Sequence, residues 1–355
     1  MSEQGVFKKE WKGMTLQTRA SWILGVAAVL ALLLFYCLSV FSHNRKSVNL
    51  VIYAYSTQEE VLSQGIFPRF EKLWESTYGR DLTIEGIFGP SLTLAGQIVL
   101  GAPADVAILS DKQHVTYLKL GKMVQENNQP LVVCKTPMVI VTRPGNPKGI
   151  RYFMDLENPD LQLIHADPRS SGAGAWAIFA EYGCSKVDTT KEVDAEELLI
   201  SIWKNVKIMA PSARASLMLF ESGVGDALVT YEQDARLALA RHVDLSIVIP
   251  PCTVMAEPVA VIVDKNVTRD ERSAANEFMQ YLLSEEGQNT FIQYQLRPVT
   301  VSTDLFPEVV QIVTEEYLGG WSEAHQELIE GVWKNKIEPN LHLELGIDSI
   351  QVYGE

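Results

Sequence analysis

The sequence predicts an α/β fold with two lobes, because strand-like and helix-like segments alternate in two successive blocks of the chain. The chain has 355 residues, 47% of them hydrophobic, which is enough for two lobes with cores of their own. Two more strand-like runs suit strands that cross between lobes: residues 138–143 lie between the blocks, and residues 258–263 follow the second block. We therefore expect lobe 1 to comprise residues 48–140 and 258–338, lobe 2 residues 141–257, and a cleft to separate them.

The first block begins with an apolar run at residues 48–53, which suits a buried strand. Residues 59–78 repeat apolar side chains on one helical face, so we expect a helix there. The block continues with expected strands at 82–88 and 106–109 and expected helices at 92–100 and 111–121. This order predicts a sheet with helices on both faces.

The second block has the same rhythm. Its expected strands are 161–166, 206–209, 227–231 and 245–249, and its expected helices are 173–182, 194–204, 217–222 and 232–241. Three more helices are expected at 269–284, 286–294 and 322–335. The C-terminal tail, residues 339–355, alternates leucine with other residues and predicts either an edge strand or a loose segment.

The N-terminal segment 21–42 contains no charged residue and is long enough to span a bilayer. Lysines and an arginine precede it, which places residues 1–20 in the cytoplasm. We therefore expect a transmembrane signal-anchor, with the rest of the chain on the extracytoplasmic (periplasmic) face of a bacterial inner membrane. The alternative is a cleaved signal peptide and a soluble periplasmic protein.

The net charge of −14 argues against nucleic-acid binding, which needs a basic face. Outside the predicted anchor there are three cysteines, Cys134, Cys184 and Cys252, and their spacing matches no metal site. We interpret them as semi-buried small hydrophobic residues, and the odd number leaves at least one thiol free.

Residues 170–176, Ser-Ser-Gly-Ala-Gly-Ala-Trp, connect an expected strand to an expected helix. Unpaired backbone N–H groups and the helix dipole make such a junction a place to hold an anion. Similar loops with hydroxyl and small residues lie at residues 55–57, 89–91 and 212–216, and Tyr231 ends another expected strand. A single such serine is usually an N-cap, but this set indicates a binding site for an anion held by neutral donors.

At these residues the chain resembles the sulfate- and thiosulfate-binding receptors of bacterial ABC importers. The resemblance covers about residues 48–335. Its strongest segments are residues 143–148 (Arg-Pro-Gly-Asn-Pro-Lys), 167–172 (Asp-Pro-Arg-Ser-Ser-Gly), 212–214, 223–226, 256–258, 284–288, 297–298 and 319–321. It implies the two-lobed type II periplasmic-binding-protein fold, which closes on its ligand by a hinge motion between the lobes.

The resemblance also implies a set of ligand-binding residues, with no catalytic residue, no cofactor and no metal. They are Ser171, Gly172 and Ala173 in one loop, Ala213 in a second, Ser56 and Ser91 in lobe 1, and Tyr231, with Arg214 in a supporting role. Arg214 is expected either behind the Ala213 loop or in a salt bridge with Asp226 or Glu232.

Two positions depart from the sulfate-receptor pattern. The family has Asp at the position of Ser56 and Trp at the position of Tyr231. Ser56, Ser91 and Tyr231 instead resemble the corresponding positions of molybdate-binding receptors.

The resemblance implies an extracytoplasmic, monomeric receptor that is not an enzyme, binds sulfate or thiosulfate, and delivers it to ABC permease subunits. A receptor for molybdate or tungstate remains an alternative, and so does a membrane-anchored oxyanion sensor or accessory subunit. An enzyme is disfavoured, because the sequence has no Walker loop, H-E-x-x-H, G-x-S-x-G or redox cysteine pair.

Overall fold

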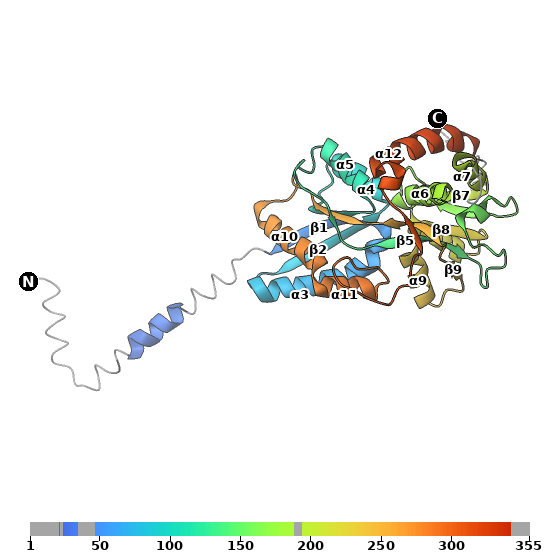
Figure 1. The fold of residues 1–355 in the computed structure, drawn as a ribbon. Coiled ribbons are helices and arrows are strands. Elements are labelled where there is room, and N and C mark those ends of the chain that lie inside the picture. Colours follow the sequence, from blue (N-terminus) through green and yellow to red (C-terminus); the bar gives the residue numbers. More distant parts are fainter. Residues whose placement is uncertain (1–20, 22–23, 35–46, 188–193, 342–355) are drawn as a thin grey trace, which may run out of the picture. The chain divides into compact units, whose positions relative to one another are not determined.

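Figure 1 shows a computed structural model of the chain, which describes residue 21 and residues 24–34, 47–187 and 194–341. The chain divides into two units after Ser47, and the unit that begins at Val48 contains both sheets of the fold.

Of the predicted anchor, residues 21–42, the structure describes Ser21 and residues 24–34, which are helical and exposed. No helix within the described residues is both long enough and apolar enough to cross a membrane. The other residues of this segment lie outside the described part of the chain, as do residues 1–20 and 342–355.

The first sheet has the strand order β2-β1-β3-β11-β4. Its strands are β1 (Val48–Tyr55), β2 (Leu82–Gly89), β3 (Val106–Leu109), β4 (Leu131–Val132) and β11 (Val259–Ile262). β1 is parallel to β2 and β3, whereas β11 is antiparallel to β3 and β4. β11 is the predicted crossing strand, and it returns the chain to this sheet after residues 136–256 have formed all but one strand of the second sheet.

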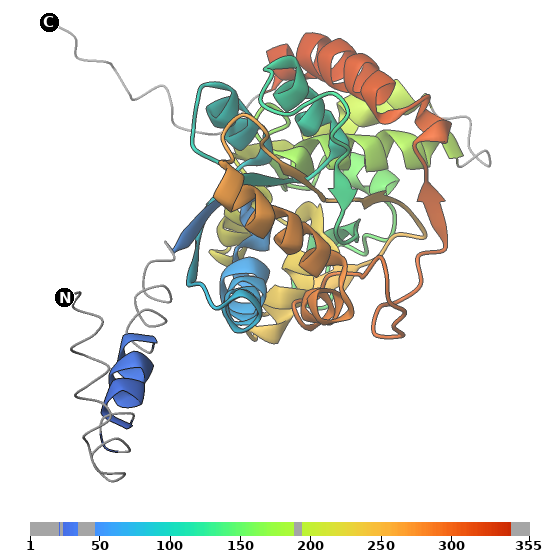
Figure 2. The same ribbon diagram turned by 90° about the vertical axis from the view of Figure 1, so that its left-hand side faces the viewer.

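Helices cover both faces of the first sheet, as predicted (Figures 1 and 2). One face packs on α3 (Phe67–Tyr78) and α10 (Arg269–Leu283), and the other on α4 (Ser91–Val99) and α5 (Lys112–Leu120). The alternation of β1 decides this: Leu50 and Ile52 pack with Phe70, whereas Tyr53 packs with Leu94. A short 3₁₀ turn (Ser56–Gln58), a π-helix (Val61–Ile66) and α11 (Glu285–Gln293) complete this lobe.

The second sheet has the order β12-β10-β5-β8-β6-β7, and β9 also pairs with β5. Its strands are β5 (Thr136–Thr142), β6 (Leu163–Ala166), β7 (Val206–Ala210), β8 (Ala227–Tyr231), β9 (Ser246–Val248), β10 (Cys252–Ala256) and β12 (Gln311–Val313). β6 is parallel to β7 and β8, so these three strands have their carboxyl ends at one edge.

The helices of the second lobe also lie on two faces. α8 (Ala213–Glu221) and α9 (Glu232–Ala240) share a core with β5 and β8. On the other face lie α6 (Gly172–Val187), α7 (Ala195–Lys204), α12 (Trp321–Ala324) and a π-helix (His325–Ile337). Short 3₁₀ turns are Phe153–Glu157, Glu316–Leu318 and Glu338–Asn340.

The boundary between the lobes differs from the predicted one. β12 pairs with β10 in the second sheet, and the helical residues 321–337 pack on α6 and α7. Residues 311–337 therefore lie with lobe 2 and not with lobe 1. The sequence analysis missed β10 and β12, and with them the ladder that holds this segment.

Three chain segments run side by side where the lobes join. The N–H of Val133 donates to the carbonyl of Pro258 (3.0 Å), and Lys135 exchanges two backbone hydrogen bonds with Arg297 (2.8 and 2.9 Å). The Lys135 ammonium also pairs with Glu257 at 3.0 Å. These connections tie both crossing segments to the chain that follows α11.

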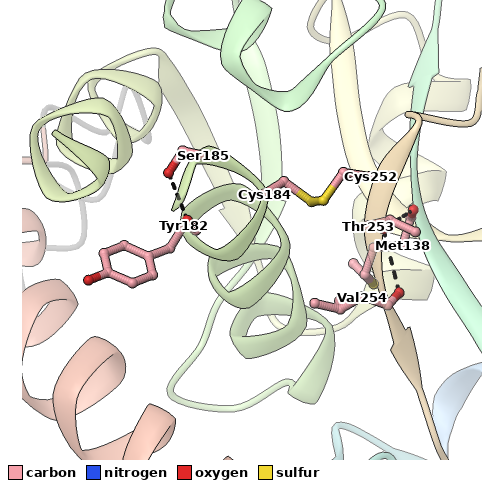
Figure 3. Close-up of a disulfide and its surroundings, with 7 residues drawn as sticks. All are labelled: Met138, Tyr182, Cys184, Ser185, Cys252, Thr253 and Val254. Carbon is pink, nitrogen blue, oxygen red and sulfur yellow. Dashed lines mark hydrogen bonds between the residues drawn. A yellow bond between two sulfur atoms is a disulfide. The ribbon is translucent and has the colours of Figure 1, made fainter. Parts of the chain in front are cut away.

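A disulfide joins Cys184 of α6 to Cys252 of β10 (Figure 3). The interpretation of three unlinked cysteines is therefore wrong for two of them, whereas Cys134 is a free, buried thiol as expected for at least one. The sequence hid the pairing because 68 residues separate the two cysteines. Packing of α6 on β10 brings their Cα atoms to 5.6 Å.

An ion-pair network connects the lobes. Arg214, the second residue of α8, binds both carboxylate oxygens of Glu60, and its Nη1 lies 2.6 Å from Oε1. Arg241 of lobe 2 is 3.5 Å from the same carboxylate. This corrects the two predicted salt-bridge partners of Arg214. Asp226 accepts from the N–H of Gln162, and Glu232 pairs with Arg297.

Asp234 on α9 lies next to this network. Its side chain is buried, and the hydroxyl of Thr230 donates to it at 3.4 Å. Burial raises the pKa of Asp234 to about 7. The charge of Arg214 opposes this rise, whereas that of Glu60 adds to it.

We predict that removal of the disulfide destabilises the protein. The Cys184→Ser/Cys252→Ser variant should lose about 2–4 kcal/mol, because the link restricts the unfolded chain. Urea unfolding under non-reducing conditions measures this. Dithiothreitol should lower the free energy of unfolding of the Cys134→Ala control, which keeps the disulfide, and leave that of the double variant unchanged. Equal stability of the wild type and the double variant would contradict a stabilising disulfide.

We also predict a pH-dependent stability from Asp234. Its folded pKa of about 7 exceeds the value of about 3.9 expected in an unfolded chain. Its contribution to stability is therefore fully present below about pH 4 and is lost as the pH rises through about 7. The melting temperature of Asp234→Asn relative to that of the wild type should consequently rise as the pH increases from about 5 to about 8. Asp160→Asn, at an exposed position, is the control, and a constant difference across this range would refute the prediction.

Candidate functional site

All of the predicted binding residues lie where a strand ends and a helix begins. Ser56 follows β1, Ser91 is the first residue of α4 after β2, and Tyr231 ends β8 before α9. Ser171, Gly172 and Ala173 start α6 after β6, and Ala213 starts α8 after β7. Ser56 is half-buried and the other six are buried. This is the edge of an α/β sheet at which ligands bind.

The structure brings the Ser91 and Ser171 loops together. The N–H of Leu92 in α4 donates to the carbonyl of Ser170 at 3.1 Å, across the two lobes. The Ser91 hydroxyl oxygen accepts the N–H of Ser110 at 2.9 Å. Ser110 in turn touches the start of α6, since a Cβ atom on Gly172 would lie 1.8 Å from Ser110 Oγ. The N-termini of α4 and α6 therefore meet at one place.

At the start of α6, Ser171, Gly172 and Ala173 were all expected to bind the ligand, but two of their backbone N–H groups are bonded within the protein. The N–H of Ala173 donates to Ser171 Oγ at 3.3 Å, and the N–H of Ser171 donates to the carbonyl of Asp167. Ser171 Oγ thus accepts from the protein and retains its own hydrogen for donation. The N–H of Gly172, at the first helical position, has no acceptor within the helix.

Tyr231 of lobe 2 contacts Tyr55 of lobe 1. Its ring packs edge-on against Tyr55, with centroids 6.1 Å apart, and its buried hydroxyl has no hydrogen-bond partner among the described residues. Burial raises the pKa of Tyr231 well above its usual value. The charges of Asp111 and Asp234 add to this rise, whereas the nearby Ser110 hydroxyl opposes it.

Ser56 and Ala213 form a second group, because the 3₁₀ turn Ser56–Gln58 packs against α8. Ser212 caps α8 by accepting the N–H of Ala215, which leaves the N–H of Ala213 without an acceptor inside the helix. Among the described residues, the Ser56 side chain forms no hydrogen bond to the other predicted residues. The Arg214–Glu60 pair holds this turn and α8 together.

Several buried polar groups that the sequence analysis missed surround these residues. Thr57, Gln58 and Gln233 each have a side-chain oxygen without a hydrogen-bond partner in the described part of the chain. The Nε2 group of Gln233 donates to the carbonyl of Thr57 across the lobes at 2.8 Å. Unpaired buried polar groups are rare and mark places where a polar ligand can bind. Their sequence signal was a polar residue one or two positions after a predicted one.

Ser110 is a further residue that the sequence analysis missed. It follows β3 just as Ser91 follows β2, so its position after a strand was the available signal. No charged side chain belongs to the predicted binding set, and the described residues contain no group of three or more metal-ligating side chains. The arrangement can hold an anion through hydroxyl and backbone N–H donors and the positive ends of helices.

Residues 50–297 match the family model described as "Bacterial extracellular solute-binding protein". The chain is 27% identical over 304 residues to a sulfate-binding protein of Synechococcus elongatus, covering 82% of this chain and 87% of that protein. It is 28% identical over 293 residues to a thiosulfate-binding protein of Pseudomonas aeruginosa, covering 77% and 87%.

The structure is similar to that of the sulfate-binding protein SubI from Mycobacterium tuberculosis H37Rv, with a TM-score of 0.72 and 25% identity. This similarity covers 79% of this chain and 99% of that one. It supports the two-lobed α/β fold, and the relatives are binding proteins and not enzymes, as expected. The family match, which extends over more than half of the chain, shows that this protein belongs to the bacterial extracellular solute-binding proteins.

Proposed function

We propose that this protein is the extracytoplasmic receptor of an ABC importer and binds a tetrahedral oxyanion, sulfate or thiosulfate. The observation that carries the proposal is the meeting of the α4 and α6 N-termini at Ser91, Ser110 and Gly172. The names of the relatives, sulfate- and thiosulfate-binding proteins, supply the ligand class. The permease subunits of the importer are the proposed protein partners, and the receptor acts as a monomer.

In the proposed binding site, which we call the clamp, each lobe supplies hydrogen-bond donors to the ion. In lobe 1, the hydroxyls of Ser56 and Ser91 bind the ion. In lobe 2, it is bound by the Ser171 hydroxyl and the N–H groups of Gly172 and Ala213. Ala173 contributes by holding Ser171 Oγ, and the Tyr231 hydroxyl completes the set. Each charge-assisted hydrogen bond to an oxyanion contributes about 1.5–3 kcal/mol.

Arg214 supports the clamp without contacting the ion. Its guanidinium is engaged by Glu60, so its charge is compensated across the lobes. This pair links α8, which carries Ala213, to the segment that follows Ser56. We propose that it stabilises the approach of the two lobes.

Molybdate is the second candidate ligand, because Ser56 and Tyr231 stand where the sulfate-receptor pattern has Asp and Trp. Both are hydroxyl donors, and both suit a larger oxyanion as well as sulfate. A panel of ions distinguishes the two candidates.

We predict that sulfate or thiosulfate stabilises the purified full-length chain. At 100 times the Kd, the ligand should add about 2.7 kcal/mol to the free energy of unfolding.

Ser171→Ala should weaken binding by about 1–3 kcal/mol in calorimetry, because a buried donor to the ion is lost. Ser222→Ala is the control, since that hydroxyl donates to the carbonyl of Leu219 at the other end of α8. No melting shift with sulfate, thiosulfate, molybdate or tungstate would refute the proposed function.

We further propose that the uncharged segment 21–42 anchors the receptor to the membrane. The full chain should then stay with the membrane fraction after a carbonate wash, and a variant without residues 1–46 should be released. Processing of the full chain to a shorter, released form would contradict the anchor and support a cleaved signal peptide.

A further inference from the structure

Ser110 is held in place from both lobes. Its N–H donates to Ser91 Oγ at 2.9 Å, and its carbonyl accepts the indole N–H of Trp176 in α6 at 3.2 Å. The residue is completely buried. Because both backbone groups are engaged, its hydroxyl stays next to the first residue of α6, where a Cβ atom on Gly172 would lie only 1.8 Å from Ser110 Oγ.

A buried histidine and carboxylate lie behind the Ser110 hydroxyl. His114 Nδ1 lies 3.4 Å from Ser110 Oγ and 3.5 Å from Asp111 Oδ1. Asp111 also accepts the N–H of His114 at 3.2 Å, and His325 Nε2 approaches its other oxygen at 3.6 Å. Burial tends to raise the pKa of Asp111, but His114 and His325 outweigh it, and the pKa lies below its usual value.

The tautomer of His114 sets the direction of the hydrogen bond to Ser110, and the nearby carboxylate of Asp111 favours one tautomer. The ionised Asp111 can only accept, so His114 carries its proton on Nδ1, the nitrogen that faces the carboxylate. Burial lowers the pKa of His114, although the charge of Asp111 opposes this, so the ring has a single proton. The same N–H faces Ser110 Oγ, which accepts from it. The hydroxyl hydrogen of Ser110 is therefore left to donate.

Resting on the proposed function, we propose that Ser110 is a further oxyanion-binding residue and that His114 and Asp111 position it as a donor. Ser110 donates to the ion from lobe 1, beside Ser91 and next to Gly172. The unpartnered Tyr231 hydroxyl lies near the same point. A hydroxyl held as a donor favours a fully ionised oxyanion, because a protonated one needs an acceptor.

Calorimetry of the full-length chain with sulfate, thiosulfate and molybdate tests this proposal. Ser110→Ala should weaken binding of the preferred ion about tenfold or more, with the melting temperature of the ligand-free protein nearly unchanged. Ser110→Cys keeps the volume and replaces a strong donor by a weak one, so it should also lose affinity, and it decides the test if the alanine variant fails to fold. Ser185→Ala is the matched control, since that buried hydroxyl donates to Tyr182 at the far end of α6 (Figure 3).

The positioning role has its own readout. His114→Phe removes the N–H that faces Ser110, so the hydroxyl becomes free to accept. The ratio of the affinities for sulfate and hydrogenphosphate should then fall, whereas a purely structural role would lower both affinities alike.

The outcomes separate this inference from the proposed function. If Ser171→Ala weakens binding and Ser110→Ala binds as the wild type does, the role of Ser110 is refuted and the receptor function stands. If the wild type binds none of the ions, both fail. A sulfate-to-phosphate ratio unchanged by His114→Phe refutes the positioning role alone.

Discussion

The contact between the N-terminus of α4 and the N-terminus of α6 is the constraint on which the binding site depends. Two helix N-termini that meet bring like partial charges together, which is unfavourable unless electron-rich groups lie between them. In the structure, the carbonyl of Ser170 and the hydroxyl oxygens of Ser91 and Ser110 occupy this position. A dianion suits the same place, because it accepts from every donor and compensates both helix dipoles. The lobes can therefore approach each other through groups that also favour an anion.

The charged side chains that connect the lobes form ion pairs with one another. Arg214 and Glu60 pair across the lobes, and Arg297 with Glu232 and Lys135 with Glu257 lie near the crossing segments. These pairs tie the lobes together without placing a net cation in the binding site. Asp111 lies behind Ser110, next to the ring nitrogens of His114 and His325. A neutral site surrounded by paired charges recognises its ligand by hydrogen-bond direction, which separates ions that differ in protonation.

Much of the fold was predictable, because strands at 106–109 and 227–231 and the helices around them follow local apolar patterns. The strands that the sequence analysis missed are short and half-exposed, as β12 is, or lack a clear alternation of buried and exposed residues, as β10 does. Missing them placed residues 311–337 in the wrong lobe and hid the disulfide. The partner of Arg214 was unpredictable for a related reason: Glu60 is 154 residues away, and only the packing of the lobes makes them neighbours.

By itself, the sequence determined the two-lobed α/β architecture, the family resemblance and the serine and glycine loops at helix starts, because these follow from local pattern and motif. Only the tertiary structure decided which loops face each other and which way their hydroxyls point. Ser110 shows the difference most clearly. In the sequence it is one serine after a strand, and its meaning comes from Gly172 and His114, whose distances to it depend on the whole fold. Hydrogen-bond direction is a property of neighbours in space, and a sequence records only neighbours along the chain.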